Sequence, residues 1–134
     1  LRTHIDAYTF ETASGETQTL GDRSAAHAPS YTRRYAVDYA GESGLFAGLE
    51  YTSTDDFYHS DNHNQQANAH RLVNGRLGYR RGPYTLTLWG RNLLDERYAV
   101  RGFFFGLSPP NYTDTLYESY GDPRQLGLNL SAAF

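Results

Sequence analysis

The sequence predicts an all-β protein, an antiparallel up-and-down meander of about six strands. Three observations support this fold class. Apolar and polar residues alternate through several stretches, which gives an extended strand one apolar and one polar face. Aromatic residues make up 15% of the chain, mainly 12 Tyr and 7 Phe, and both residue types favour strands. The connections between these stretches are alternately long and short along the chain.

Six stretches are expected to form the strands. In order they are residues 1–11, 31–40, 45–54, 69–79, 84–98 and 124–134. Long polar connections at 13–30, 55–68 and 99–120 contain the Gly, Pro, Asn and Ser residues that are typical of loops. Short turns at 41–44 and 80–83 join hairpins. The fifth stretch loses its alternation around 90–94, where a β-bulge is expected.

In the closing stretch the alternation is strict. An apolar residue occupies each even position from 126 to 134, and polar or small residues occupy the odd positions. Such a strand suits a wall with lipid on one side and water on the other. Alternate connections of a meander lie at the same end, so all long loops share one end and all tight turns the other. Outer-membrane barrels have this asymmetry, with long extracellular loops and short periplasmic turns.

The composition argues against several classes of function. The net charge of -3 gives no electrostatic basis for binding nucleic acid. The absence of Cys excludes a disulfide framework and a thiolate zinc site. No Gly-x-Ser-x-Gly motif, phosphate loop or His-Glu-x-x-His motif occurs. The chain is therefore not expected to be an enzyme or to carry a cofactor.

A group of acidic and His residues in the second long connection is the one candidate metal site. It consists of Asp55, Asp56, His59, Asp61 and His63. Two His residues four positions apart align as ligands on a helix, and nothing in this stretch is helical. A solvated polar loop is therefore favoured over a metal site.

Six strands are too few for a single-chain bacterial barrel, the smallest of which has about eight. An open sheet would leave unpaired backbone groups in hydrocarbon, each of which costs several kcal/mol. The chain therefore either oligomerises into a small outer-membrane pore or forms part of a larger transmembrane β-barrel. It contains no Met, and hence no start residue, which favours the second. A soluble β-sandwich that serves as a binding module is the remaining alternative.

Two segments resemble the C-terminal barrel segment of TonB-dependent outer-membrane receptors. In the family's penultimate-strand motif, an apolar strand runs into Asn-Leu-Phe-Asp, a charged pair and Tyr. Residues 86–98 match this pattern from Asn92 to Tyr98, with Leu94 in place of Phe. The stretch Gly121-Asp122-Pro123-Arg124, followed by an alternating strand and Phe134, is similar to the family's last strand. Within that strand, a set of residues looks like the signal read by the barrel-assembly machinery: Gln125, Gly127, Leu130, Ala132 and Phe134.

The resemblance implies that residues 1–134 are the C-terminal part of a receptor barrel of about 22 strands, closed inside by a plug domain. Such receptors lie in the outer membrane of Gram-negative bacteria and take up scarce ligands, commonly ferric siderophores. The implied partners are outer-membrane lipid, the barrel-assembly machinery, and the rest of the barrel with its plug. TonB would be reached only through an N-terminal part that this chain does not include. The identity of the ligand does not follow from the sequence.

Aromatic residues are concentrated in the third long connection, at 99–120. They are Phe103, Phe104, Phe105, Tyr112, Tyr117 and Tyr120. Aromatic side chains on a loop can contact an apolar or planar ligand. They can also pack on the barrel rim or on neighbouring loops, so both interpretations stay open.

Overall fold

The structure is a computed structural model that describes residues 3–11, 15–107 and 109–133. In this part of the chain all regular structure is β, as the sequence predicts. The strands of the first half are β1 (Tyr8–Glu11), β2 (Thr17–Leu20), β3 (Thr32–Ala40), β4 (Leu45–Thr54), β5 (Phe57–Tyr58) and β6 (Gln66–Ala67). Those of the second half are β7 (His70–Arg81), β8 (Tyr84–Arg91), β9 (Ala99–Phe105), β10 (Thr115–Tyr120) and β11 (Gln125–Ala132).

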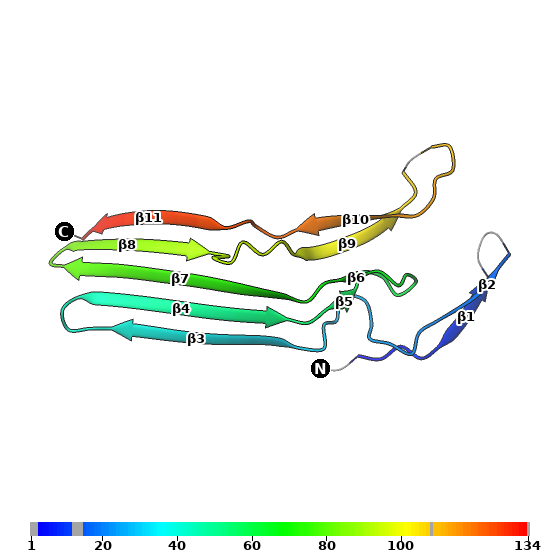
Figure 1. Cartoon of the computed structure of the whole chain (residues 1–134), viewed down its shortest axis with the longest axis horizontal. Coiled ribbons are helices and arrows are strands. Elements are labelled where there is room, and N and C mark those ends of the chain that lie inside the picture. Colours follow the sequence, from blue (N-terminus) through cyan, green and yellow to red (C-terminus); the bar gives the residue numbers. More distant parts are fainter. Residues whose placement is uncertain (1–2, 12–14, 108, 134) are drawn as a thin grey trace. The chain divides into compact units, whose positions relative to one another are not determined.

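Among the described residues, the longest strands form one antiparallel five-stranded sheet. Its order is β3, β4, β7, β8 and β11, so neighbours in the sheet follow one another along the chain (Figure 1). The bounds of β3, β4, β7 and β11 differ from the predicted ones by at most two residues at the described ends. The expected up-and-down meander is thus confirmed for these strands.

Tight turns join the strands at one end of this sheet. Between β3 and β4, Gly44 has φ +92, and an added Cβ would overlap the carbonyl of Arg80. The amide of Arg80 donates to the carbonyl of Gly44 at 2.9 Å, so this turn is held against β7. Gly82, with φ +58, forms the turn between β7 and β8. Only glycine adopts such φ values without strain, which explains how both turns stay short.

The chain divides into two compact units, and the sheet is one of them. The sheet unit consists of Thr32–Thr54, His70–Arg97 and Asp122–Phe134. The other unit consists of Leu1–Tyr31, Asp55–Ala69 and Tyr98–Gly121, which corresponds closely to the three predicted long connections together with the first predicted strand. We call it the connection unit. The structure thereby confirms the alternation of short and long connections for the four connections between strands of the sheet. The first predicted long loop, 13–30, joins no two strands of the sheet and contains β2.

The prediction that residues 1–11 form a strand of the sheet is wrong. Only Tyr8–Glu11 is a strand, and it pairs with β2, while Ile5 forms an isolated bridge with Arg23. Gly15 has φ +82 between the two strands, so a short local hairpin closes there at little entropic cost. Residues 1–2 and 12–14 lie outside the described residues. The sheet consequently has five strands where about six were expected.

The prediction of long loops at 55–68 and 99–120 is also partly wrong, because each of these stretches contains paired strands. β5 pairs with β6, and β9 pairs with β10. Aromatic side chains favour strands, and the three consecutive Phe residues 103–105 all lie in β9. Long connections without any regular structure are uncommon in compact domains.

The fifth strand ends earlier than predicted, and no bulge extends it to residue 98. β8 stops at Arg91 because Asn92 takes a positive φ of 46. The chain then turns, and the amide of Asp95 donates to the carbonyl of Asn92 at 2.9 Å.

Candidate functional site

Most of the large apolar side chains of the five strands lie on one face of the sheet. Tyr39 pairs with Ala47, and Ala47 with Leu77; the row then continues through Leu88 to Leu128. Directly paired residues project from the same face. The large apolar side chains of this face, here called the apolar face, are Tyr35, Val37, Tyr39, Leu45, Leu49, Tyr51, Val73, Leu77, Tyr79, Tyr84, Leu86, Leu88, Leu126, Leu128 and Leu130. Three arginines, Arg33, Arg71 and Arg81, lie on the same face near the ends of their strands.

The apolar face is largely exposed. Exposed fractions of its leucines run from 42% for Leu45 to 73% for Leu130. Among the described residues, the buried hydrophobic side chains are Phe57, Ala67 and Ala99, and all three belong to the connection unit. A sheet normally buries an apolar face against a second layer, and exposed apolar patches of this extent mark a surface for a membrane or a partner.

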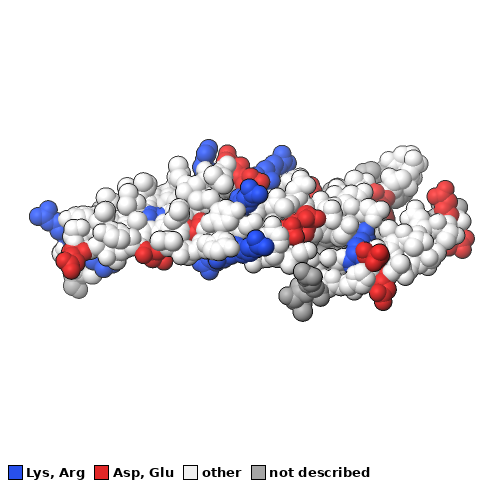
Figure 2. Space-filling view, turned by 60° about the horizontal axis from the view of Figure 1, so that its bottom comes forward, with Lys and Arg blue, Asp and Glu red and all other residues white. Residues whose placement is uncertain are grey.

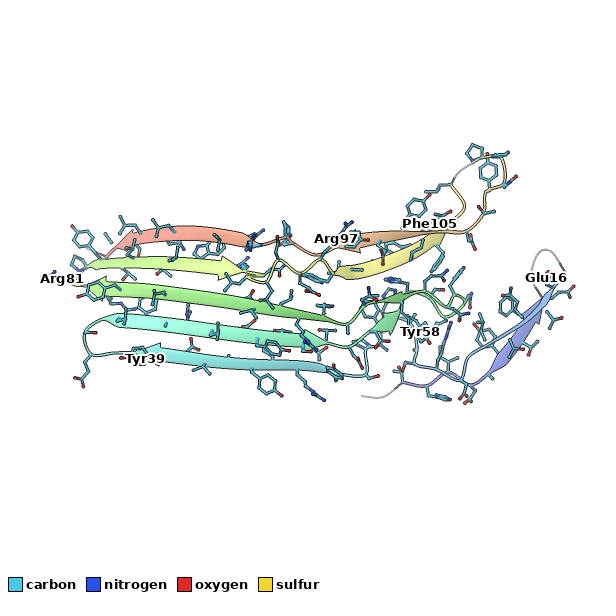
Figure 3. The ribbon with its side chains drawn as sticks, in the orientation of Figure 1. Glu16, Tyr39, Tyr58, Arg81, Arg97 and Phe105 are labelled. Atoms are coloured by element: carbon cyan, nitrogen blue, oxygen red, sulfur yellow. The ribbon has the colours of Figure 1, made fainter. Side chains whose placement is uncertain are left out.

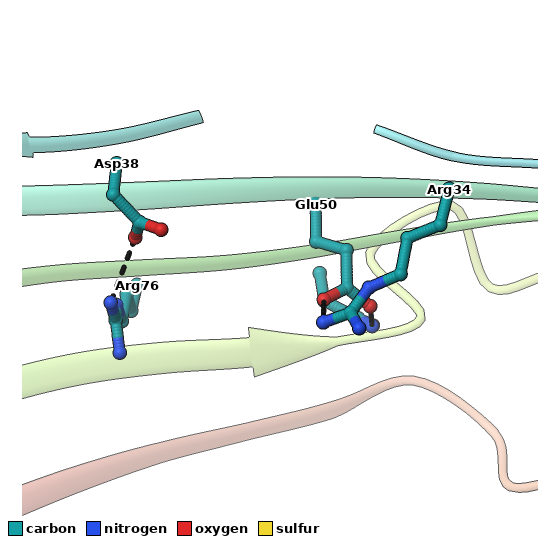
Figure 4. Close-up of polar contacts among 5 residues, drawn as sticks. Arg34, Asp38, Glu50 and Arg76 are labelled. Atoms are coloured by element: carbon teal, nitrogen blue, oxygen red, sulfur yellow. Dashed lines mark hydrogen bonds and ion pairs between the residues drawn. The ribbon is translucent and has the colours of Figure 1, made fainter. Parts of the chain in front are cut away.

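The opposite face, here called the polar face, carries paired charges. Arg34 and Glu50 form an ion pair, and Arg76 bonds Asp38 at 2.7 Å (Figure 4). The side-chain amide of Asn74 donates to Glu50 at 3.3 Å. In the space-filling view, charges of opposite sign lie next to one another in several places (Figure 2). The two faces of the sheet therefore differ as the sequence predicts, one apolar and one polar.

Two aromatic rings of the polar face lie over glycines of the neighbouring strand. Phe46 of β4 is paired with Gly78 of β7, and Trp89 of β8 with Gly127 of β11. A Cβ added at either glycine would overlap the opposite ring. A ring that covers a cross-strand glycine excludes water from that part of the backbone and fixes the register of the two strands.

Gly127→Ala is expected to destabilise the protein by about 1–3 kcal/mol, because the added methyl group overpacks against Trp89. The measurement is the free energy of unfolding in denaturant. Ser131→Ala, on the same face of the same strand, is the control and is expected to change little. In a Trp89→Leu background the Gly127→Ala penalty should largely disappear; an unchanged penalty would contradict this role of Gly127.

The segment that resembles the penultimate-strand motif forms a hydrogen-bonded corner around Asn92. Its buried side-chain amide donates to the carbonyls of Glu96 at 2.9 Å and Asp122 at 3.0 Å, and its Oδ1 accepts from the amide of Glu96. The amide of Asn92 itself donates to Asn74 Oδ1 at 3.0 Å. One side chain thus ties the end of β8 to the segment that enters β11. The resemblance identified this segment, but only the fold shows what Asn92 does.

Asp95 completes the corner from the other side. It also has a positive φ, of 55, and its carboxylate accepts from the amide of Arg124 at 3.0 Å. Asn and Asp tolerate this backbone region better than other residues with a Cβ. The Asn and Asp of the motif are therefore the two residues whose backbone and side chains both build the corner.

In the connection unit, the structure corrects the prediction of a solvated loop at His59. The His59 side chain is fully buried, with 0% exposed, and Nε2 lies 3.1 Å from Glu118 Oε1 on β10. Its ring packs edge-on to Phe57 and lies over Gly102 of β9, where a Cβ would clash with it. The β9–β10 hairpin, which is distant from His59 in sequence, supplies this environment, and the local sequence does not indicate it.

His63 joins the same loop to the β9–β10 hairpin. Its ring stacks on Phe104 at 3.6 Å between centroids, and Nε2 lies 3.5 Å from Asp114 Oδ2. Nδ1 is 3.0 Å from the hydroxyl of Ser60. Each of the two histidines thus faces its own carboxylate. Among the described residues, no group of three or more His, Cys, Asp or Glu side chains is arranged to hold a metal ion.

The predicted ligand-contact residues do not all lie on one surface. Phe103, Phe105 and Tyr117 project from one face of the β9–β10 hairpin, whereas Phe104 projects from the other and stacks on His63. Figure 3 labels Phe105 on β9. Tyr112 lies between the strands, exposed and with φ 48. The Tyr120 hydroxyl donates to Glu118 at 2.6 Å.

The predicted assembly-signal residues lie along the outer strand β11. Leu130 and Ala132 project from the apolar face, and Gln125 and Gly127 from the polar face. Phe134 lies outside the described residues. The arrangement of the four is that of an alternating edge strand.

No protein-family model matches this chain, and no solved structure matches it. No helix long and apolar enough to span a lipid bilayer occurs among the described residues.

Proposed function

We propose that residues 1–134 form the C-terminal part of the barrel of a TonB-dependent outer-membrane receptor, which takes up a scarce ligand such as a ferric siderophore. The observation that carries this proposal is the apolar face. Its large apolar side chains extend across β3, β4, β7, β8 and β11, opposite a face of paired charges. Lipid outside and a wet lumen inside require this division.

Lipid is a better environment for the apolar face than a second protein layer. A β-sandwich would cover this face with side chains of another sheet, packed about 10 Å away. Among the described residues of the sheet unit, only Gly78, Gly90 and Asn92 are buried, so this unit has no such layer of its own. The leucines instead occupy alternate positions along β8 and β11, the pattern of a membrane-spanning strand.

The two outer strands support a larger barrel. Within the described residues, β3 and β11 each pair with one neighbour only. Their free backbone groups would have to find further strands in hydrocarbon, where each unpaired group costs several kcal/mol. In the proposed receptor these strands come from the rest of the barrel. A small pore would instead pair β3 of one copy with β11 of the next, and the mass of the detergent-extracted protein distinguishes the two.

The corner around Asn92 and the alternating β11 support the receptor class in particular. They occupy the positions of the two motifs that resemble the TonB-dependent family, residues 86–98 and 121–134. The connection unit would then lie on the extracellular side, as the long loops of outer-membrane barrels do. Plug, TonB contact and ligand choice would depend on other parts of the receptor.

Cysteine labelling tests the assignment of the two faces. The sequence contains no Cys, so each substitution introduces one reactive thiol. In outer-membrane preparations, Leu128→Cys is expected to be protected from a water-soluble maleimide, because its side chain faces lipid. Asn129→Cys, the next residue along β11, is expected to react faster, because it faces the lumen.

The two variants are matched in depth, so their difference reports the face alone. Both thiols should react at the same rate after denaturation. If both thiols of the folded protein react as fast as they do after denaturation, the membrane proposal is contradicted and a soluble module is favoured.

A further inference from the structure

One row of the apolar face, at the end away from the tight turns, is charged. Arg33 of β3 and Arg71 of β7 are both paired with Ser53 of β4, so the three side chains project from this face side by side. Each arginine is exposed and is the second residue of its strand. Neighbouring strands lie about 4.8 Å apart, so the two arginines start about 10 Å from one another. Side chains of this length can converge on one group between them.

Toward the middle of the same face, the side chains leave a hollow. Gly75 and Gly90 are paired with one another across β7 and β8, and neither has a side chain to fill the space above it. The hollow has a volume of about 490 Å³. The apolar side chains that line it are Val37, Tyr39, Ala47, Leu49, Leu77, Leu88, Leu93 and Leu126. Such a lining accepts a hydrocarbon chain, whereas a polar group would lose its hydrogen bonds there.

We propose that the charged row and the hollow together bind one anionic phospholipid. Its phosphate lies between Arg33 and Arg71, and one of its acyl chains lies in the hollow. A guanidinium binds phosphate through two parallel hydrogen bonds, and the Ser53 hydroxyl can donate a further one. Gly75 follows Arg71 by four residues along β7, about 13 Å, a span that the glycerol linkage and the first part of an acyl chain cover. The inference rests on the proposed function, because the apolar face must lie in the membrane.

The paired arginines distinguish this site from the lipid contacts of the rest of the apolar face. An arginine on a lipid-facing surface is costly near the middle of the bilayer and is tolerated near the headgroups, so this row suits the level of lipid phosphates. At the turn end, the same face carries Arg81 (Figure 3), whose row continues with Tyr84 and Ala132. That row holds one arginine where the proposed site holds two.

Native mass spectrometry tests the charged row. The full-length protein, extracted in a neutral detergent, is titrated with phosphatidylglycerol, and the fraction that retains one lipid is measured. The double variant Arg33→Gln, Arg71→Gln is expected to bind phosphatidylglycerol about tenfold more weakly or less, because it loses hydrogen bonds between charged groups. Arg81→Gln is the matched control and is expected to bind like the parent. An equal loss in Arg81→Gln would mean general charge attraction and would overturn the site.

A second pair of variants tests the hollow. Ala47→Leu is expected to lower the retention of phosphatidylglycerol, because the larger side chain fills space that the acyl chain would take. Ala132→Leu is the matched control, since Ala132 lies on the same face outside the hollow. Glycerol phosphate, which has the headgroup chemistry without acyl chains, is expected not to compete. Unchanged retention in Ala47→Leu, or full competition by glycerol phosphate, would overturn the assignment of the hollow to a lipid chain.

The failure of this inference is distinguishable from the failure of the proposed function. Phosphatidylcholine, which has no net charge, is expected to be retained less than phosphatidylglycerol by the parent protein. If both lipids are retained equally while labelling of Leu128→Cys shows membrane insertion, the lipid site is wrong and the proposed function stands. If the labelling places the apolar face in water, both are wrong. If the parent retains no lipid and forms dimers, a second copy covers the apolar face, and the lipid site is likewise wrong.

Discussion

Replacing Leu88 by arginine is expected to lower the free energy of unfolding of the membrane-inserted protein by about 2–4 kcal/mol. Leu88 lies near the middle of β8, in a row of the apolar face between Leu77 and Leu128. Neither neighbour offers an opposite charge, so the guanidinium would enter hydrocarbon alone or pull the strand toward water. Denaturant unfolding in phospholipid vesicles, followed by Trp89 fluorescence, measures the effect.

Thr87→Arg is the matched control for this substitution. Thr87 is adjacent in β8 but projects from the polar face, between Gly78 and Asn129. An arginine there would join a face that already holds Arg34 and Arg76 in ion pairs, and a change within about 0.5 kcal/mol is expected. Equal losses in the two variants would mean that the faces do not differ in environment, and the lipid assignment would fail.

The five-stranded sheet was predictable because its information is local and periodic. In β8, Leu86 and Leu88 alternate with Thr85 and Thr87, and this pattern alone assigns each side chain to a face. A period of two also fixes the register, since a slip by one residue would exchange the faces. The tight turns were predictable for the same reason, because Gly44 and Gly82 act within their own turns.

The connection unit was not predictable, because side-chain contacts between segments distant in sequence build it. His59 is polar and lies among Asp and Asn residues in sequence, yet it is buried against Gly102 and Glu118. No local pattern links residue 59 to residue 118. Likewise, consecutive Phe residues indicate a strand, but which ring turns inward depends on where β9 pairs with β10. The period of two separates Phe104 from Phe103 and Phe105 in any strand, but only the fold shows that Phe104 is the ring that meets His63.

The corner around Asn92 occupies a middle position between these cases. Its residues are identifiable from the resemblance, and the physical reason for them appears only when Asp122 and Asn74 are placed beside Asn92. Three hydrogen bonds of one buried side chain and a positive φ converge on this residue. A single substitution at Asn92 should therefore lower the stability of the sheet strongly without changing a side chain of the apolar face or of the polar face.

Asn92→Ala is expected to lower the free energy of unfolding by about 2–4 kcal/mol. The amide of Glu96 and the carbonyls of Glu96 and Asp122 lose their partner, and buried groups left unpaired cost about 1–3 kcal/mol. The left-handed backbone adds about 1 kcal/mol for a residue with a Cβ that lacks the local hydrogen bonds of Asn. The measurement is denaturant unfolding under the same conditions as for Leu88→Arg.

Two further variants separate the hydrogen bonds from the backbone. Asn92→Gly removes the same bonds but accepts φ +46 freely, so it should be more stable than Asn92→Ala by about 1 kcal/mol. Asn92→Asp keeps the oxygen that accepts from the Glu96 amide. Its second oxygen, however, would face the carbonyls of Glu96 and Asp122, which need a donor. This variant should therefore be less stable than the parent, although the side chain has nearly the same shape. If Asn92→Asp is as stable as the parent, the side-chain amide does not hold β8 to the start of β11. The corner would then depend on the backbone of residues 92–96 alone.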